Sequence, residues 1–374
     1  MKITFILYIL AISICAIYRP KSKIVNFILL FTIWTLFVFS FDNYDRFYYE
    51  RMFDNSTIKG ATGYEMLFIE SMALFKKLGF DFYEYRYFSG AITVLLTNLA
   101  IWKYCRFPNL VLLLYLFSQA LVNACLMRHA IAFGFALIYL PLLFYSIFEK
   151  QKILLYISIG LLFITPFIHS AFWVLFLFIP YVYYIKKKPR IANVIIVAIV
   201  VFVIFITFRG ITGSILSNLS MRDGAYEKIV NASGANLNGI IYNILKYLFN
   251  FAPVLLVLYY KKKHEIGVKD IPNNPIVNTF NKNIIYINLF FLFILTAQYF
   301  TVLFARLFGL QLIMNYIYVA NILFQNKKMK SFFVPFLILH SIIFVCLRFF
   351  YESPTSYEDI WIMHLQTNLF IQIF

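Results

Sequence analysis

The chain has 374 residues, of which 62% are hydrophobic and 21% aromatic, while only 13% are charged. Its mean hydropathy of +0.80 excludes an ordinary soluble domain, because a chain of this length has no core large enough for so much apolar surface. Many of the apolar runs have close to the ~20 residues of helix that cross a bilayer. The composition therefore predicts an all-α fold, that of a polytopic helical membrane protein.

The net charge of +17 would favour a nucleic-acid partner if the charges were spread over one surface. Instead, the basic residues lie in short clusters between apolar runs, as in the cytoplasmic loops of membrane proteins. We therefore expect the lipid bilayer as a partner and no nucleic acid. The four cysteines lack metal-ligand spacing and no nucleotide-binding or metalloenzyme motif occurs, so no metal or cofactor is expected.

The first apolar segment, residues 1–18, lacks a signal-peptide cleavage pattern and runs directly into the basic sequence RPKSK, which predicts a retained helix. If all the basic clusters face the cytoplasm, each pair of neighbouring clusters must be joined by an even number of crossings. The clusters lie at 19–23, 103–106, 149–152, 186–190, 261–265 and 326–330.

Three long apolar stretches between these clusters must each form a helical hairpin. The 33 residues 153–185 would make a single helix of about 50 Å, which is far longer than the core of a bilayer. Pro166 favours a break in this stretch, and His169 is then expected at the tip of the hairpin. Arg128 and Arg306 divide the two other stretches in the same way.

This scheme treats 1–374 as a single integral membrane domain with about twelve transmembrane helices and both termini outside. No internal repeat of fixed period is visible, which weakens a transporter interpretation based on inverted repeats. The helices are expected near 1–18, 24–41, 84–102, 107–127, 129–148, 153–168, 170–185, 191–208, 239–260, 283–305, 307–325 and 331–349.

Two long loops are predicted on the outer side, at 42–83 and at 209–238. In the first, Thr62 and Glu65 have the spacing of a capping box, and Gly79 suits the end of a helix. The segment between them predicts an amphipathic helix at the outer membrane–water interface. The second loop is rich in glycine and small polar residues and is expected to form a mobile cover.

The outer ends of the helices hold the candidate functional residues. Arg128, His169 and Arg306 stand at three tips, where an arginine either snorkels to lipid headgroups or lines a polar cavity, and where a histidine is either a hydrogen-bonded turn residue or a catalyst. Polar pairs at i, i+4 favour the cavity, because such stripes avoid lipid. These pairs are Gln119 and Asn123 before Arg128, and Gln311 and Asn315 after Arg306.

A cavity lined by cations suits an anionic ligand, since the arginine fork matches phosphate oxygens. Carboxylates of the first outer loop are candidate general bases, and its tyrosines are either sugar-stacking surfaces or ordinary residues of the membrane interface. The candidate catalytic residues are Arg128, His169, Arg306, Asp42, Asp45 and Glu65. The candidate substrate-binding residues are Arg209, Arg222, Lys246, Tyr44, Tyr48, Gln311 and Asn315.

Five motifs follow one another as they do in a known family: FDNYDRFYYE, GYEMLFIESMALFKKLGFDF, LMRHAIAFGFALI, ITPFIHSAFWVLF and ARLFGLQLI. Through them the chain, over about residues 40–320, resembles EpsG-like membrane proteins, the Wzy-type polymerases of bacterial O-antigen and capsular polysaccharide. The strongest elements are Arg128 and the pair His169–Ser170. The glutamine common after that arginine is His129 here, so no role is assigned to position 129.

The resemblance implies a membrane glycosyltransferase of GT-C-like architecture that acts at the outer, periplasmic face of the bacterial plasma membrane, in lipopolysaccharide, capsule or exopolysaccharide biosynthesis. Its substrate would be undecaprenyl-diphosphate-linked oligosaccharide, and a chain-length-regulating co-polymerase would be a further partner. Three alternatives stay open, namely a flippase or transporter of the same ligand, a membrane O-acyltransferase and a glycan ligase.

Overall fold

The computed structural model is built from helices. It describes residues 3–39, 44–56, 65–207, 237–264, 271, 274–298, 306–323, 327–351 and 371, and every regular element in these ranges is helical. Contacts divide the chain into two compact units. The first comprises 1–138, 167–169 and 319–374, and the second comprises 139–166 and 170–318.

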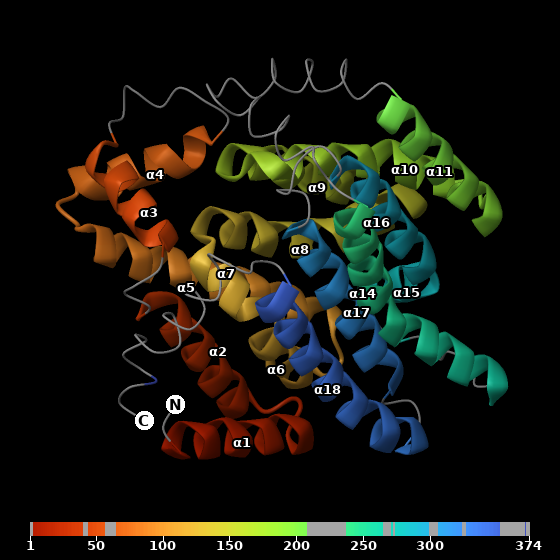
Figure 1. Cartoon of the computed structure of the whole chain (residues 1–374), viewed down its shortest axis with the longest axis horizontal. Coiled ribbons are helices and arrows are strands. Elements are labelled where there is room, and N and C mark those ends of the chain that lie inside the picture. The colour runs from red at the N-terminus through yellow and green to blue at the C-terminus, as the bar shows by residue number, and fades with distance from the viewer. Residues whose placement is uncertain are drawn as a thin grey trace. The chain divides into compact units, whose positions relative to one another are not determined.

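The first unit contains the N-terminal helices and the helix Lys327–Tyr351 near the C-terminus (Figure 1). Its elements are α1 (Ile3–Tyr18), α2 (Lys23–Val38), α3 (Tyr44–Asp54), α4 (Met66–Lys77), α5 (Phe82–Tyr104), α6 (Pro108–Tyr115), a π-helical turn (Leu116–Ala120), α7 (Leu121–Cys125), the first part of α8 (Met127–Phe148), the end of α17 (Phe308–Leu323) and α18 (Lys327–Tyr351).

The second unit contains most of the middle of the chain. Its elements are the rest of α8, most of α9 (Lys152–Ile168), a 3₁₀ helix (Ser170–Leu177), α10 (Phe178–Lys186), α11 (Ile191–Thr207), α14 (Leu237–Lys263), α15 (Pro275–Lys282), α16 (Ile284–Gln298) and most of α17.

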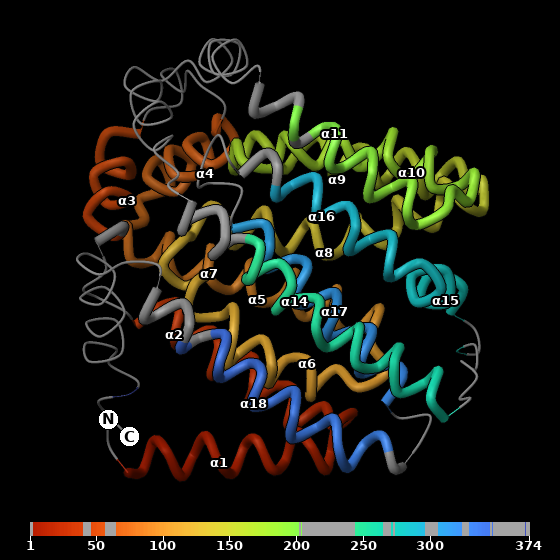
Figure 2. The backbone as a smooth tube through the Cα atoms, turned by 45° about the vertical axis from the view of Figure 1, so that its right-hand side comes forward, coloured from red at the N-terminus to blue at the C-terminus, as the bar shows by residue number. Residues whose placement is uncertain are grey.

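Helix α2 lies at the centre of the first unit, where it packs against α1, α5, α6 and α7. Gly90 of α5 permits the close approach to α2, because a Cβ atom at this position would lie 3.3 Å from the Cβ of Phe37. Asn26 and Asn98 join the same two helices through a side-chain hydrogen bond of 3.1 Å, as amides do between helices in lipid. Figure 2 shows α1, α6 and α18 side by side in this unit.

The amphipathic helix predicted in the first outer loop is present as α4, which packs against α3 and α5 (Figure 1). Phe68 and Met72 are buried on one side of α4, while Lys76 and Lys77 are exposed. The chain leaves the helix at Gly79, whose φ of +87° is a conformation that glycine adopts at no steric cost. The predicted stop is confirmed, and a location at the membrane interface stays a prediction.

The capping-box prediction for Glu65 is wrong. Glu65 is itself the N-cap residue, helix α4 begins at Met66, and the Glu65 side chain makes no capping hydrogen bond. Thr62 lies outside the described residues. Instead of capping the helix, the Glu65 carboxylate pairs with Arg128 of another helix.

Two predicted helices have more complex backbones than their apolar sequences indicate. The helix expected at 107–127 changes at Leu116–Ala120 to π-helical hydrogen bonding, then ends at Cys125. The helix expected at 170–185 begins as the 3₁₀ helix Ser170–Leu177. Pro166 lies inside α9, and the helix ends at Ile168, so the predicted break at His169 is confirmed.

Helix α16 is the centre of the second unit and packs against α10, α11 and α14. Phe290 of α16 meets Phe178 of α10 edge to face, with ring centroids 4.8 Å apart. The Tyr181 hydroxyl of α10 donates to the carbonyl oxygen of Tyr286 at 2.5 Å. Aromatic packing and buried polar contacts therefore act together between these helices.

Three helical stretches in the described part are long and apolar enough to cross a membrane: Pro108–Cys125, Met127–Phe148 and Ile244–Lys263. Eight further apolar helices have 10–17 residues each. Large apolar side chains such as Ile3 and Ile153 are exposed, as expected of helix faces in contact with lipid. The all-helical membrane fold is confirmed, whereas the count of twelve crossings and the side of the termini stay predictions.

Candidate functional site

Three of the predicted catalytic residues form one buried ionic cluster in the first unit, which we call the Glu65 cluster (Glu65, Arg128 and His169). The Arg128 guanidinium pairs with Oε2 of Glu65 through Nη1. The Nδ1 atom of His169 lies 3.1 Å from Oε1 of the same carboxylate. The exposed fractions of the side chains are 11% for Glu65, 12% for Arg128 and 4% for His169, so water screens these interactions weakly.

Each member of the Glu65 cluster stands where the backbone enters or leaves a helix. Glu65 is the N-cap residue of α4. Leu126, with φ −113° and ψ 66°, separates α7 from α8 and places Arg128 in the first turn of α8. His169 lies between the end of α9 and the 3₁₀ helix. Helix ends thus bring together side chains that lie up to 104 residues apart in the sequence.

Two tyrosines of α3 hold the Arg128 guanidinium. Its Cζ atom lies 5.6 Å from the ring centre of Tyr48 and 5.4 Å from that of Tyr49, within the range of cation–π attraction. Its Nε also donates to the Tyr49 hydroxyl at 3.4 Å. The Tyr49 ring packs edge-on against Phe68 of α4, with centroids 5.8 Å apart. The arginine is therefore held by two adjacent tyrosines of α3.

The contacts of Glu65 fix the tautomer of His169. An ionised carboxylate only accepts hydrogen bonds, and the adjacent Arg128 favours the ionised form of Glu65. Nδ1 of His169 must therefore carry the hydrogen and donate it to Glu65, which leaves the lone pair of the neutral ring on Nε2. A carboxylate that orients a histidine in this way is a known arrangement for general-base catalysis.

The structure also brings His129 to this cluster. The ring of His129 lies edge-on to that of His169, with centroids 5.5 Å apart and an interplanar angle of 84°. The ring of His129 also contacts that of Phe133, one turn further along α8. We assigned no role to His129 from the sequence, and only its position next to Arg128 could have drawn attention to it.

The other predicted site residues have different locations. Tyr48 joins the Glu65 cluster through Arg128. Four residues belong to the second unit, and the described part does not relate them to the cluster: Lys246, Arg306, Gln311 and Asn315. Tyr44 and Asp45 are in helix α3, but their side chains lie outside the described part. Asp42, Arg209 and Arg222 lie outside the described residues altogether.

Both predicted polar stripes face the protein interior. Gln119 Nε2 donates to Asn123 Oδ1 at 3.1 Å, and Asn123 Nδ2 donates to the Tyr115 hydroxyl at 3.0 Å. Neither Gln119 nor Asn123 has exposed surface. These hydrogen bonds connect side chains of α6, the π-helical turn and α7 along the segment that leads to Arg128.

The second stripe forms a cluster of amides in the second unit, which we call the amide cluster (Asn250, Asn288, Gln311 and Asn315). Oδ1 of Asn288 accepts from Gln311 Nε2 at 2.9 Å and from Asn315 Nδ2 at 2.8 Å. Asn315 Nδ2 also donates to the carbonyl oxygen of Asn250 at 2.7 Å. These hydrogen bonds join α14, α16 and α17, so they account for the amides as structural residues.

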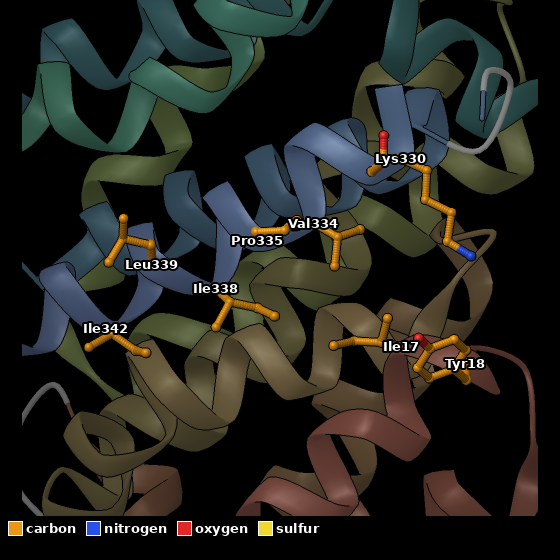
Figure 3. A pocket seen from close by; sticks show the side chains of 9 residues that line it. Ile17, Tyr18, Lys330, Val334, Pro335, Ile338, Leu339 and Ile342 are labelled. Atoms are coloured by element: carbon orange, nitrogen blue, oxygen red, sulfur yellow. The ribbon is translucent and has the colours of Figure 1, made fainter. Parts of the chain in front are cut away.

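An elongated groove of about 650 Å³ lies between the end of α1 and α18 in the first unit (Figure 3). Ile17, Val334 and Ile338 line its apolar part, and Tyr18 and Lys330 lie at one end. None of its lining residues belongs to the Glu65 cluster. The groove is therefore separate from the candidate site.

The family model described as EpsG family matches residues 23–362, which is nearly the whole chain. No curated protein and no solved structure matches the chain. The matched region includes every residue of the Glu65 cluster and of the amide cluster.

Proposed function

Because this chain belongs to the EpsG family, we propose that it is a bacterial polysaccharide polymerase that joins undecaprenyl-diphosphate-linked oligosaccharide repeat units. The reaction would take place at the outer face of the plasma membrane. The observation that carries the proposal is the buried Glu65 cluster, in which a carboxylate holds a histidine and an arginine at helix ends. A helical membrane protein has little reason to bury such a set except for chemistry.

In the proposed reaction, a hydroxyl of one lipid-linked unit attacks C1 of the terminal sugar of the growing chain. The bond between C1 and the diphosphate oxygen breaks, and undecaprenyl diphosphate leaves with the bonding electrons. The proton of the attacking hydroxyl passes to Nε2 of His169, since Nδ1 already carries a hydrogen. No cofactor is needed for this balance.

The geometry favours His169 over Glu65 as the base. Both oxygens of Glu65 are engaged, one by Arg128 and the other by His169, which stabilises its charge and makes it a poor proton acceptor. We assign to Glu65 the role of a positioning residue. Asp42 and Asp45 stay candidates for the same proton, because their side chains lie outside the described part.

Arg128 is proposed to stabilise the negative charge that develops on the leaving diphosphate, since preorganised cations lower such barriers. Tyr48 is proposed to stack against a sugar beside it. Three further cations stay proposed substrate-binding residues, with no described position relative to the Glu65 cluster: Lys246, Arg209 and Arg222. Arg306 stays a proposed catalytic residue on the same terms.

Deletion of the gene tests this function against its rivals. Without a polymerase, cells should still export glycan, but as single repeat units on the carrier or on its final acceptor. Without a flippase or a ligase, no surface glycan should be present at all. A mutant that lacks surface glycan altogether would favour one of those alternatives, and glycan of normal length that lacks an acyl group would favour an acyltransferase.

Complementation of the deletion strain then tests the site. The wild-type gene should restore long glycan chains, whereas His169→Asn should leave single repeats because the proton acceptor is lost. His264→Asn is a matched control, since His264 is exposed at the end of α14, and it should restore long chains. Long chains from His169→Asn at matched protein level would remove His169 from the mechanism.

A further inference from the structure

Arg86 is a buried cation that the proposed mechanism does not use. It stands in the second turn of α5 and has only 4% of its surface exposed. Its Nε donates to the carbonyl oxygen of Phe37 at 3.0 Å, while its buried Nη1 has no hydrogen-bond partner. Among the described residues, the ion pairs of arginine are Arg46 with Glu50 and Arg128 with Glu65, and Arg86 has none.

The surroundings of Arg86 link it to the candidate site. Phe37 is the penultimate residue of α2. Cys125, the last residue of α7, lies within electrostatic range of the Arg86 guanidinium. Arg128 follows Cys125 by three residues. Arg46 of α3 is also within electrostatic range and adds a second positive charge, although Glu50 already balances it.

Only part of the charge of Arg86 is compensated within the protein. The carbonyl end of α2 carries a partial negative charge and occupies one of the five donors of the guanidinium. Burying a cation without a full counter-charge is costly, and the two hydrogens of Nη1 are left without an acceptor. Arg128 differs, because Glu65 neutralises it. Arg86 therefore offers an anionic ligand a positive charge that none of the ion pairs in the described part of the chain balances.

We infer that Arg86 binds a phosphate group of the polyprenyl diphosphate carrier. This inference rests on the proposed function and names the residue that holds the anionic part of its substrate. The planar fork of arginine presents parallel donors that match two phosphate oxygens, and Nε stays bonded to Phe37, so the fork keeps its orientation. Glu65 and His169 would act on the sugar, and Arg86 on the carrier.

The test measures binding of farnesyl diphosphate, a short polyprenyl diphosphate, to the purified full-length protein in nanodiscs. Farnesol and inorganic pyrophosphate are compared with it, because they separate the lipid chain from the phosphates. Arg86→Met should weaken binding of farnesyl diphosphate by about tenfold or more, the usual effect of losing a hydrogen bond to a charged group. The affinity of Arg86→Lys for farnesyl diphosphate should lie between those of wild type and Arg86→Met. Arg51 is an exposed arginine of α3, so Arg51→Met should bind like wild type.

The apo protein provides a second readout. If Arg86 awaits an anion, Arg86→Met should melt at the wild-type temperature or above it without ligand, because a desolvated charge is removed. If Arg86 only caps α2, the variant should melt lower and bind farnesyl diphosphate as wild type does, which would overturn the inference. If Arg86→Met does not fold, Arg86→Gln takes its place, because it keeps a donor for the carbonyl oxygen of Phe37. Its melting temperature and its binding of farnesyl diphosphate are compared with those of wild type in the same way.

The same experiment separates this inference from the proposed function. If the wild-type protein binds none of the three probes, the polymerase proposal itself loses its substrate. If wild type binds farnesyl diphosphate and both Arg86→Met and Arg86→Gln bind it equally well, only the role of Arg86 is refuted. Equal affinity for pyrophosphate and farnesyl diphosphate would mean that Arg86 binds a free phosphate and not a lipid carrier.

Discussion

Glu65 and Arg128 should be strongly coupled in stability, and a double-mutant cycle measures this directly. The two side chains are only 11% and 12% exposed. Glu65→Gln would therefore leave a buried arginine without its counter-charge, and Arg128→Met would leave a buried carboxylate. Breaking a buried pair from one side costs about 3–5 kcal/mol, whereas replacing both charges together is often close to neutral. The coupling energy should accordingly be at least about 3 kcal/mol.

The assay is unfolding in mixed micelles for wild type, the two single variants and the double variant. The Arg46–Glu50 pair of α3 is a matched control in the same unit, with an N–O distance of 3.5 Å and exposed fractions of 17% and 32%. An i,i+4 pair of this kind should couple by only about 0.3–0.5 kcal/mol. A coupling of about 1 kcal/mol or less for Glu65 and Arg128 would show that water reaches the cluster, and the burial argument would fail.

Two further predictions concern the arginines and a glycine. Arg128→Lys and Arg306→Lys should both shorten the glycan, since losing one preorganised contact costs roughly 10²–10³ in rate. Wild-type glycan length from both at matched expression would identify interface anchors instead. Gly134→Ala should lower the melting temperature, because the new Cβ would lie 2.7 Å from the Cβ of Leu96. Gly160→Ala should not, since nothing lies within 4 Å there, and equal effects would contradict this reasoning.

The sequence was sufficient for the long apolar helices and for the break at His169. It missed α3 (Tyr44–Asp54) and α15 (Pro275–Lys282), which lie in predicted loops. The length of the apolar stretch 153–185 exceeds what one crossing holds, and this geometric limit does not depend on fine structure. Gln119 and Asn123 were also predictable as interior residues, because two amides on one helix face are costly in lipid. Both inferences depend only on the spacing of residues within one helical stretch, and this spacing can be counted in the sequence.

The pairing within the Glu65 cluster could not be predicted. Glu65 and His169 are 104 residues apart, and no local pattern selects one carboxylate of the outer loop over another. The local sequence pattern even gave a wrong prediction here. The spacing of Thr62 and Glu65 matches a capping box, but Glu65 does not take part in one. The π-helical turn at Leu116–Ala120 was also missed, since an apolar run does not distinguish between registers of backbone hydrogen bonding.

The amide cluster has a consequence for the substitutions that this chain is able to accept. Oδ1 of Asn288 satisfies donors from both Gln311 and Asn315. An apolar residue in place of Asn288 alone would leave these two buried donors without that acceptor. Apolar residues in place of Asn288, Gln311 and Asn315 together would remove the donors as well. A single substitution of one of these amides is therefore costly, whereas simultaneous substitution of all three costs much less. Descendants of this chain should keep the three amides as a set or replace them as a set.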